Sequence, residues 1–218
     1  MTAAQRKPLK QKAQVRTNTT RGSVCKIDVP AVKFSDLWDN YVTGEPYRDA
    51  KTGGVPPGFG NQCAIRMSVT LHKVGIEMKS FTPANVSVKP GHQFGRILMG
   101  GRYTAVLADQ MGSWLSKHPF CGLRRTEDIT GRDWESKVKG RTGIIMFDSY
   151  WSRSSDSAGD ASGGHIDLWN GSRLTISGPI NSLATVGRMF GMNSLFPGSS
   201  FGFSDLGDSK KILFWEVK

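Results

Sequence analysis

The chain has 218 residues, of which 38% are hydrophobic and 22% are charged, and its formal net charge is +11. This length and composition, with 26 glycines, predict one loop-rich globular domain and exclude a wholly disordered chain. No run of about 18 apolar residues occurs, so we expect no membrane span, and no apolar core of a classical secretory signal follows the basic N-terminus.

Residues 1–24 carry much of the positive charge and contain no acidic residue. We predict a flexible basic arm here, followed by a single domain over residues 25–218. The arm fits either a solvated tail or a segment attracted to a polyanion, such as nucleic acid, a membrane surface or an acidic cell wall. Charge alone does not choose among these partners.

The first half of the domain predicts helices separated by a long loop. Apolar residues between 34 and 41 recur at helical spacing, so we expect a short helix that packs on the core. Residues 43–60 are rich in Gly and Pro and predict a loop. A helix should begin near Gln62, with Asn61 as its N-cap, and end at Val74 before Gly75.

The remaining elements change from helices to strands. Residues 103–117 place Tyr103, Leu107, Met111 and Trp114 on one helical face, and residues 133–139 predict a shorter helix. Strands are expected over residues 143–147, 165–169, 173–177 and 212–217, with a polar loop over 149–163 and a two-residue hairpin turn at 170–171. Helices followed by an antiparallel sheet predict an α+β fold, which sets a helix-borne cysteine against a sheet-borne histidine.

Cys63 is the strongest candidate nucleophile. It follows a glycine-rich loop and starts the predicted helix, where free backbone N–H groups and the helix dipole favour a thiolate. Cys121 lies in a predicted turn and Cys25 lies near the arm. From the residues alone, Cys63 fits a nucleophile or a buried structural thiol, and Cys25 and Cys121 fit a disulfide or two ordinary thiols.

His165 is the candidate base. It shares one strand face with Asp167, while Ile166 and Leu168 point the other way. His72 lies on the opposite side of the helix from Cys63, and His92 and His118 fall in predicted loops. The alternative for His165 is a surface histidine on a strand.

Two octapeptides carry a resemblance to a known family. Residues 61–68, Asn-Gln-Cys-Ala-Ile-Arg-Met-Ser, and residues 164–171, Gly-His-Ile-Asp-Leu-Trp-Asn-Gly, resemble the two catalytic motifs of the fourth family of type VI secretion amidase effectors. These are papain-like cell-wall cysteine peptidases related to the NlpC group. The resemblance covers residues 34–217 and implies a papain-like fold with its N-terminal helices packed on a C-terminal antiparallel sheet.

The resemblance also implies a reaction. Cys63 would attack the D-glutamyl–diaminopimelate amide of peptidoglycan stem peptides, and His165 would move the protons. The backbone N–H of Cys63 would help to hold the oxyanion. The type VI secretion apparatus would carry the protein into a rival's periplasm, a dedicated immunity protein would block its cleft, and no cofactor or metal would be needed.

One position departs from the family pattern. The family places an aspartate eleven residues after the histidine, where this chain has Ile176. The group that orients His165 is therefore expected to be Asp167, with Ser177, Asp205, Asp208 or a water as alternatives.

This departure keeps a second hypothesis open, in which the chain is a weak or inactive papain-like module whose basic surface binds an anionic polymer or nucleic acid. A zinc hydrolase built on His92, His165 and a carboxylate is a third hypothesis, without support from any metal-binding spacing.

Overall fold

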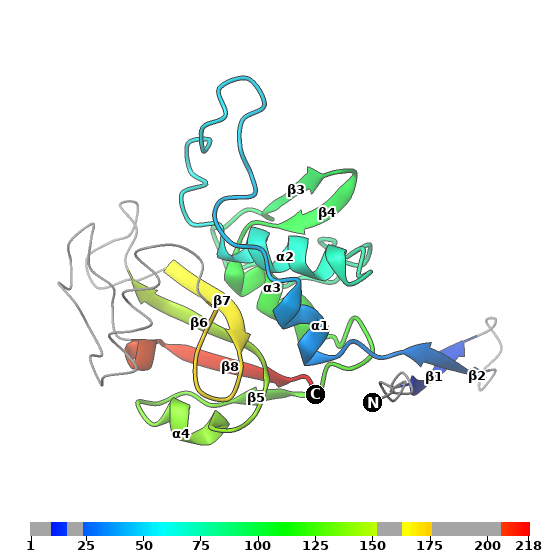
Figure 1. Cartoon of the computed structure of the whole chain (residues 1–218). Helices are drawn as coiled ribbons and strands as arrows, with labels where there is room; N and C mark the ends of the chain where they lie inside the picture. Colours follow the sequence, from blue (N-terminus) through cyan, green and yellow to red (C-terminus); the bar gives the residue numbers. More distant parts are fainter. Residues whose placement is uncertain (1–9, 17–23, 152–162, 176–205) are drawn as a thin grey trace, which may run out of the picture.

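The catalytic candidates lie on a four-stranded antiparallel sheet and on a helix packed against it. The computed structural model describes residues 10–16, 24–151, 163–175 and 206–218 (Figure 1). The sheet has the strand order β5-β8-β6-β7. Its strands are β5 (Thr126–Asp128), β8 (Lys211–Glu216), β6 (Gly143–Trp151) and β7 (Gly163–Trp169).

Both faces of this sheet are covered. Helices α2 (Cys63–Lys73) and α3 (Ala108–Leu115) pack on one face, where Ile144 and Ile166 from the sheet join Met67 and Met111 in the larger apolar cluster. The short helices α4 (Trp134–Val138) and η1 (Leu206–Asp208) pack on the other face, around Phe147 and Trp169. Figure 1 shows α2 and α3 on the opposite side of the sheet from α4. The alternation predicted for residues 165–169 is therefore confirmed for its apolar residues, because Ile166 and Leu168 lie on the face covered by α2 and α3 and Trp169 lies on the face covered by α4.

Helix α2 lies where it was predicted, but its N-cap is Gln62 and not Asn61. Cys63, Met67 and Leu71 are buried along one stripe, as their spacing indicates. The helix ends at Lys73 with Val74 as its C-cap, and the following Gly75 has a φ of +88°. The N–H of Gly75 donates to His72 O and the N–H of Ile76 donates to Leu71 O, which is the Schellman arrangement that a glycine at this position favours.

The helix predicted over residues 103–117 is wrong in its first turn. Tyr103 belongs to strand β4 (Arg102–Ala105), which pairs with β3 (Arg96–Met99), and α3 begins only at Ala108. The turn between these strands is Gly100-Gly101, and both glycines have positive φ. Two such residues close a tight hairpin, so local turn chemistry overrides the helical spacing of the apolar residues.

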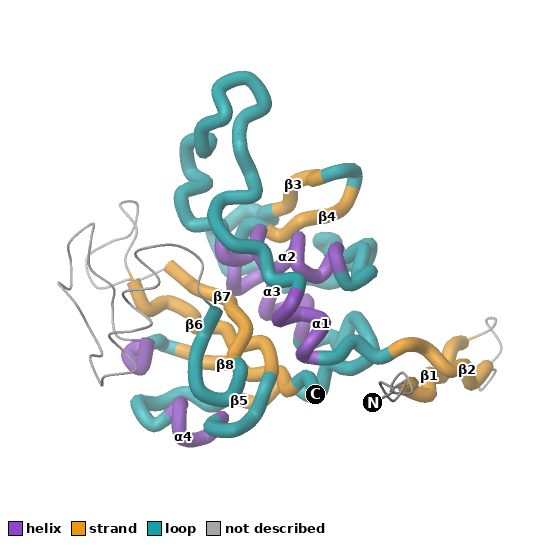
Figure 2. The backbone as a smooth tube through the Cα atoms, in the orientation of Figure 1, coloured by secondary structure: helices purple, strands orange, loops and turns teal. Residues whose placement is uncertain are grey.

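A long loop leads from the first helix to α2. Helix α1 spans Phe34–Asp39, and residues 43–60 contain no helix or strand, as Figure 2 shows. The side chain of Gln62, which is fully buried, closes the base of this loop. Its Oε1 accepts from the N–H of Tyr47 at 2.8 Å, and its Nε2 donates to Tyr47 O at 2.8 Å. The residue before Cys63 therefore ties the loop to the start of α2.

An N-terminal hairpin stands apart from the main sheet (Figure 1). Strand β1 (Lys10–Arg16) pairs with β2 (Val24–Pro30). The predicted boundary between residues 24 and 25 falls at the start of β2, and the division into arm and domain stays a prediction. In the described part of the chain, no helix is long and apolar enough to cross a membrane.

Candidate active site

Cys63 lies at the junction of α2 and the outer edge of the sheet. In the described part of the chain, β7 is the edge strand of the sheet, and the outer edge of β7 next to His165 faces α2. The Cys63 thiol donates to Gly164 O at 3.9 Å, and the N–H of Ile166 donates to the sulfur. The side chain is 3% exposed. The first residue of α2 is therefore held directly beside the residue before and the residue after His165.

His165 and Cys63 form a coupled pair. Burial by itself raises the pKa of Cys63, but a hydrogen bond from His165, the charge of His165 and the N–H of Ile166 together lower that pKa. Burial by itself lowers the pKa of His165, but hydrogen bonds with Asp167 and Cys63 raise it to about 9. Both shifts favour a thiolate beside an imidazolium.

Asp167 supports the imidazole from two residues along the same strand face. Its Oδ2 lies 3.3 Å from His165 Nε2, which leaves Nδ1 of the ring for Cys63. Its Oδ1 accepts from the N–H of Leu168 at 2.8 Å and from the hydroxyl of Thr175. The carboxylate is 2% exposed, so these contacts fix its orientation as well as its charge. The structure therefore brings together Cys63, His165 and Asp167.

The other residues considered for orienting His165 are not found beside it in the described part of the chain. Asp208 forms an exposed ion pair with Arg132, Oδ1 to Nη2 at 2.9 Å, and does not contact His165. Ser177, Asp205 and Ile176 lie outside the described residues.

The predicted two-residue hairpin turn after β7 is wrong. Trp169 lies opposite Leu174, so the loop between them has four residues. Asn170 Oδ1 accepts from the N–H groups of Ser172 and Arg173, an Asx-type turn that lengthens the loop. A two-residue turn would place Trp169 opposite Ser172, so the predicted register of the returning strand is wrong.

Sequence reasoning missed three residues around Asp167. Thr175 holds the carboxylate, as described above. The Oη of Tyr41 and the Nε of Arg66 are buried nearby without a hydrogen bond of acceptable geometry, although Tyr41 lies close to both Thr175 and Arg66. Burial first, and then the charge of Asp167, raise the pKa of Tyr41 well above its usual range. The one sequence signal that could have placed Arg66 near the site is its position in α2, three residues after Cys63 and so on a neighbouring part of the helix surface.

The remaining cysteines and histidines lie elsewhere. His72 donates from its Nε2–H to Tyr103 O at 3.0 Å, and burial lowers its pKa. His92 and His118 are exposed. Cys121 is a free thiol, while the side chain of Cys25 is not among those described. Within the described ranges, no group of three acidic, histidine or cysteine side chains is placed to hold a metal ion.

The described residues also form a hollow away from Cys63. It has a volume of about 550 Å³ and lies between α4 and the turn after β7, with Trp134, Lys139 and Ser172 in its wall. Neither Cys63 nor His165 lines it. The reactive groups thus lie at the seam between α2 and β7 and not in this hollow.

Comparisons with known proteins bear on the family and the fold. The model of the family described as type VI secretion system (T6SS), amidase effector protein 4, or Tae4, matches residues 59–215. The crystal structure of the type VI effector Tae4 from Enterobacter cloacae is 18% identical, covers 85% of this chain and 96% of its own, and has a TM-score of 0.50. This likeness confirms the predicted α+β, papain-like fold.

Two further matches are effector–immunity complexes. The Tae4–Tai4 complex from Enterobacter cloacae is 18% identical with a TM-score of 0.48, and the Tae4/Tai4 structure from Salmonella typhimurium is 16% identical with a TM-score of 0.45. Each covers 85% of this chain and 98% of its own. No curated protein sequence matches the chain.

Proposed function

Since the chain belongs to the Tae4 family of type VI secretion amidase effectors, which act on peptidoglycan, we propose that Cys63, His165 and Asp167 form its catalytic centre. The proposed substrate is the D-glutamyl–diaminopimelate amide of the stem peptide. The observation that carries this proposal is the position of the Cys63 thiol on Gly164 O, next to a histidine whose imidazole Asp167 supports at 3.3 Å.

The first half of the proposed reaction uses the ion pair directly. The Cys63 thiolate attacks the glutamyl carbonyl carbon and forms a tetrahedral intermediate with a negative oxygen. When the C–N bond breaks, the imidazolium of His165 donates its proton to the leaving amine of diaminopimelate. A thioester between Cys63 and the glutamyl residue remains.

The second half releases the glutamyl product. Neutral His165 now accepts a proton from water, whose oxygen attacks the thioester carbonyl and expels the Cys63 thiolate. Asp167 keeps the ring oriented through both halves and stabilises its charged form, because its own orientation is fixed by Leu168 and Thr175.

We assign the negative oxygen of each intermediate to the backbone N–H of Cys63. This N–H starts α2 and so has no partner within the helix. Its contact with Asn61 Oδ1 is long, at 3.4 Å, and an oxyanion is a stronger acceptor than a neutral amide oxygen. The substrate oxygen would therefore replace Asn61.

The family also frames where the protein would act. We propose that the type VI apparatus carries the chain from the cytoplasm into the periplasm of the target cell, where peptidoglycan is accessible. A cognate immunity protein would neutralise it there by covering the cleft beside Cys63. Residues 25–218 would act as one catalytic domain, with residues 1–24 as a basic arm.

Digestion of purified muropeptides tests this proposal. The wild-type protein, under reducing conditions, is expected to release a glutamyl carboxylate and a free diaminopimelate amine, both resolved by mass spectrometry. Cys63→Ala should abolish cleavage, whereas Cys121→Ala, which removes a free thiol outside the site, should retain it. Equal cleavage by wild type and Cys63→Ala, or no cleavage by wild type, would refute the proposal.

A further inference from the structure

A cluster of charged and polar side chains lies beside the catalytic seam and takes no part in the proposed chemistry. Lys89 Nζ donates to Asp148 Oδ1 at 2.7 Å and to Ser149 Oγ at 3.3 Å, and Ser149 Oγ donates to Asp148 Oδ1 at 3.2 Å. We call these three residues the Lys89 cluster. The lysine side chain is 36% exposed and the aspartate is 16% exposed, so the cluster lies at a surface and not in the core.

A distortion of strand β6 builds the cluster. The pairing of β6 with β7 shifts between Phe147 and Trp151, and Ser149 within this shift has a φ of +55°. A serine rarely adopts this left-handed conformation, and such residues and bulges occur often beside functional sites. Asp148 and Ser149 are adjacent in the strand, so their side chains would point to opposite faces in a regular strand. With the irregularity, both side chains reach Lys89.

The loop that carries Lys89 is also held in place. Val86 is buried, and the N–H of Ser87 donates to Ser113 Oγ of α3 at 2.8 Å. Two side chains on a strand and one on a tethered loop therefore converge.

Gly164 connects the Lys89 cluster to the catalytic cysteine. The carbonyl oxygen of Gly164 lies 3.9 Å from the Cys63 sulfur, and a Cβ built on Gly164 would lie 3.9 Å from Asp148 Oδ1. Gly164 therefore lies between the Cys63 sulfur and Asp148, so a substrate residue bound at Cys63 would extend toward the cluster.

The ammonium of Lys89 retains capacity for a ligand. It has three N–H donors, and among the described residues it uses one on Asp148 and one on Ser149. Within the described ranges the third donor has no protein partner, and the lysine side chain is 36% exposed. Asp148 and Ser149 hold the ammonium in one place, so little side-chain entropy remains to be lost on binding.

We propose that Lys89, positioned by Asp148 and Ser149, binds a carboxylate of the stem peptide next to the scissile amide. This inference rests on the proposed function and names a specificity residue for the same reaction. Glutamate has two carboxyl groups, and when one supplies the scissile carbonyl the other lies four carbon–carbon bonds away, about 5 Å when extended. Diaminopimelate carries a second carboxylate at the far end of its side chain, about 7 Å from its scissile nitrogen. Either carboxylate would give the same charge-assisted hydrogen bond.

Defined muropeptides separate these two sources. One substrate has both carboxylates free, one has the glutamyl carboxylate converted to an amide, and one has the distal diaminopimelate carboxylate converted to an amide. The kcat and KM of the wild type, Lys89→Met and Lys89→Arg are measured on all three. Lys79→Met is the matched control. Lys79 also forms an ion pair with a carboxylate, Glu77 at 2.5 Å, but it lies beyond the C-terminal end of α2, whereas Cys63 is at the N-terminal end.

The expected result is a loss that depends on the substrate. Lys89→Met should raise KM for the free-carboxylate substrate about tenfold with a smaller change in kcat, Lys89→Arg should recover most of this loss, and Lys79→Met should have no effect. Amidation of the carboxylate that Lys89 binds should weaken the wild type about tenfold and leave Lys89→Met unchanged. The amide that shows this pattern identifies the source.

Two results overturn the proposal in distinguishable ways. If the wild type cleaves the free-carboxylate substrate and both amides lower kcat/KM equally in wild type and Lys89→Met, the role of Lys89 is refuted and the amidase function stands. If the wild type cleaves none of the substrates, the proposed function fails together with this inference. Unchanged thermal unfolding of Lys89→Met checks that the variant is folded.

Discussion

Replacing Asp167 with asparagine isolates the contribution of the buried carboxylate to the proposed catalytic pair. The substitution keeps the size of the side chain and removes its charge. Leu168 N–H can only donate, so the amide oxygen of the variant should stay at the position of Oδ1. The NH2 group would then face His165 Nε2 and, as a donor, would favour an unprotonated Nε2.

The magnitude follows from the geometry. Two unit charges separated by 3.3 Å attract by about 5 kcal/mol at an effective dielectric constant of about 20, which corresponds to between three and four powers of ten. The cost of desolvating a buried pair reduces the net value. We therefore expect kcat/KM on muropeptides to fall about 10²- to 10³-fold in Asp167→Asn.

A second measurement on the same variant tests the physical cause. Iodoacetamide alkylates the thiolate, so the pH dependence of the alkylation rate follows the thiol pKa. Without the Asp167 charge, the imidazolium is less stable and the pKa of Cys63 should rise, which moves the alkylation profile to higher pH. Asp208→Asn is the control, because this carboxylate pairs with exposed Arg132 and should change neither activity nor alkylation.

The reasoning is refuted if Asp167→Asn retains activity within threefold of wild type with an unshifted alkylation profile. A large loss of activity in Asp208→Asn would instead indicate that Asp208, in η1, is the carboxylate that supports His165.

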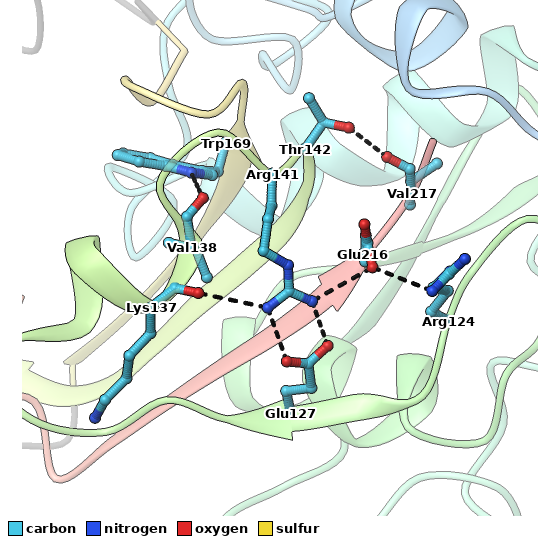
Figure 3. Close-up of polar contacts among 9 residues, drawn as sticks. All are labelled: Arg124, Glu127, Lys137, Val138, Arg141, Thr142, Trp169, Glu216 and Val217. Atoms are coloured by element: carbon cyan, nitrogen blue, oxygen red, sulfur yellow. Dashed lines mark hydrogen bonds and ion pairs between the residues drawn. The ribbon is translucent and has the colours of Figure 1, made fainter.

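Two further predictions concern pH and stability. Because the raised pKa of His165 is about 9 and its protonated form donates to the leaving amine, kcat/KM should fall as pH rises through about 9, and an alkaline limb near pH 6.5 would contradict the assignment. Because the pKa of His165 is higher in the folded state, its protonation also contributes to the free energy of unfolding. This contribution should be fully present below pH 6.5 and lost as the pH rises through about 9. Arg141 binds Glu127 through both terminal nitrogens, at 2.9 and 2.5 Å, and reaches Glu216 at 3.4 Å (Figure 3), so Arg141→Met should lower the free energy of unfolding in urea by about 1.5–3 kcal/mol. The control Arg132→Met removes a pair whose arginine is 82% exposed and should cost at most about 1 kcal/mol, and equal losses in the two variants would argue against the Arg141 network.

Local sequence was sufficient to predict an element where interactions within a few residues decide its conformation. The stripe of Cys63, Met67 and Leu71 and the glycine at 75 specify α2, because amphipathic spacing and a positive φ act within a few residues. The same holds for β7, where the side-chain period of two places His165 and Asp167 on one face. Tyr103 is the counterexample, because a Gly-Gly hairpin turned a helical apolar spacing into a strand.

The sequence by itself therefore determined the identity of a helix-borne thiol, a strand-borne imidazole and a carboxylate two residues away. The tertiary structure decided how they meet, because α2 and β7 are about a hundred residues apart in the chain and only their packing brings Gly164 and Ile166 against the sulfur. It also decided what fixes Asp167 and what surrounds the site. Thr175 reaches the carboxylate across a four-residue loop, and Lys89 meets Asp148 and Ser149 across 59 and 60 residues, through contacts that no local pattern encodes.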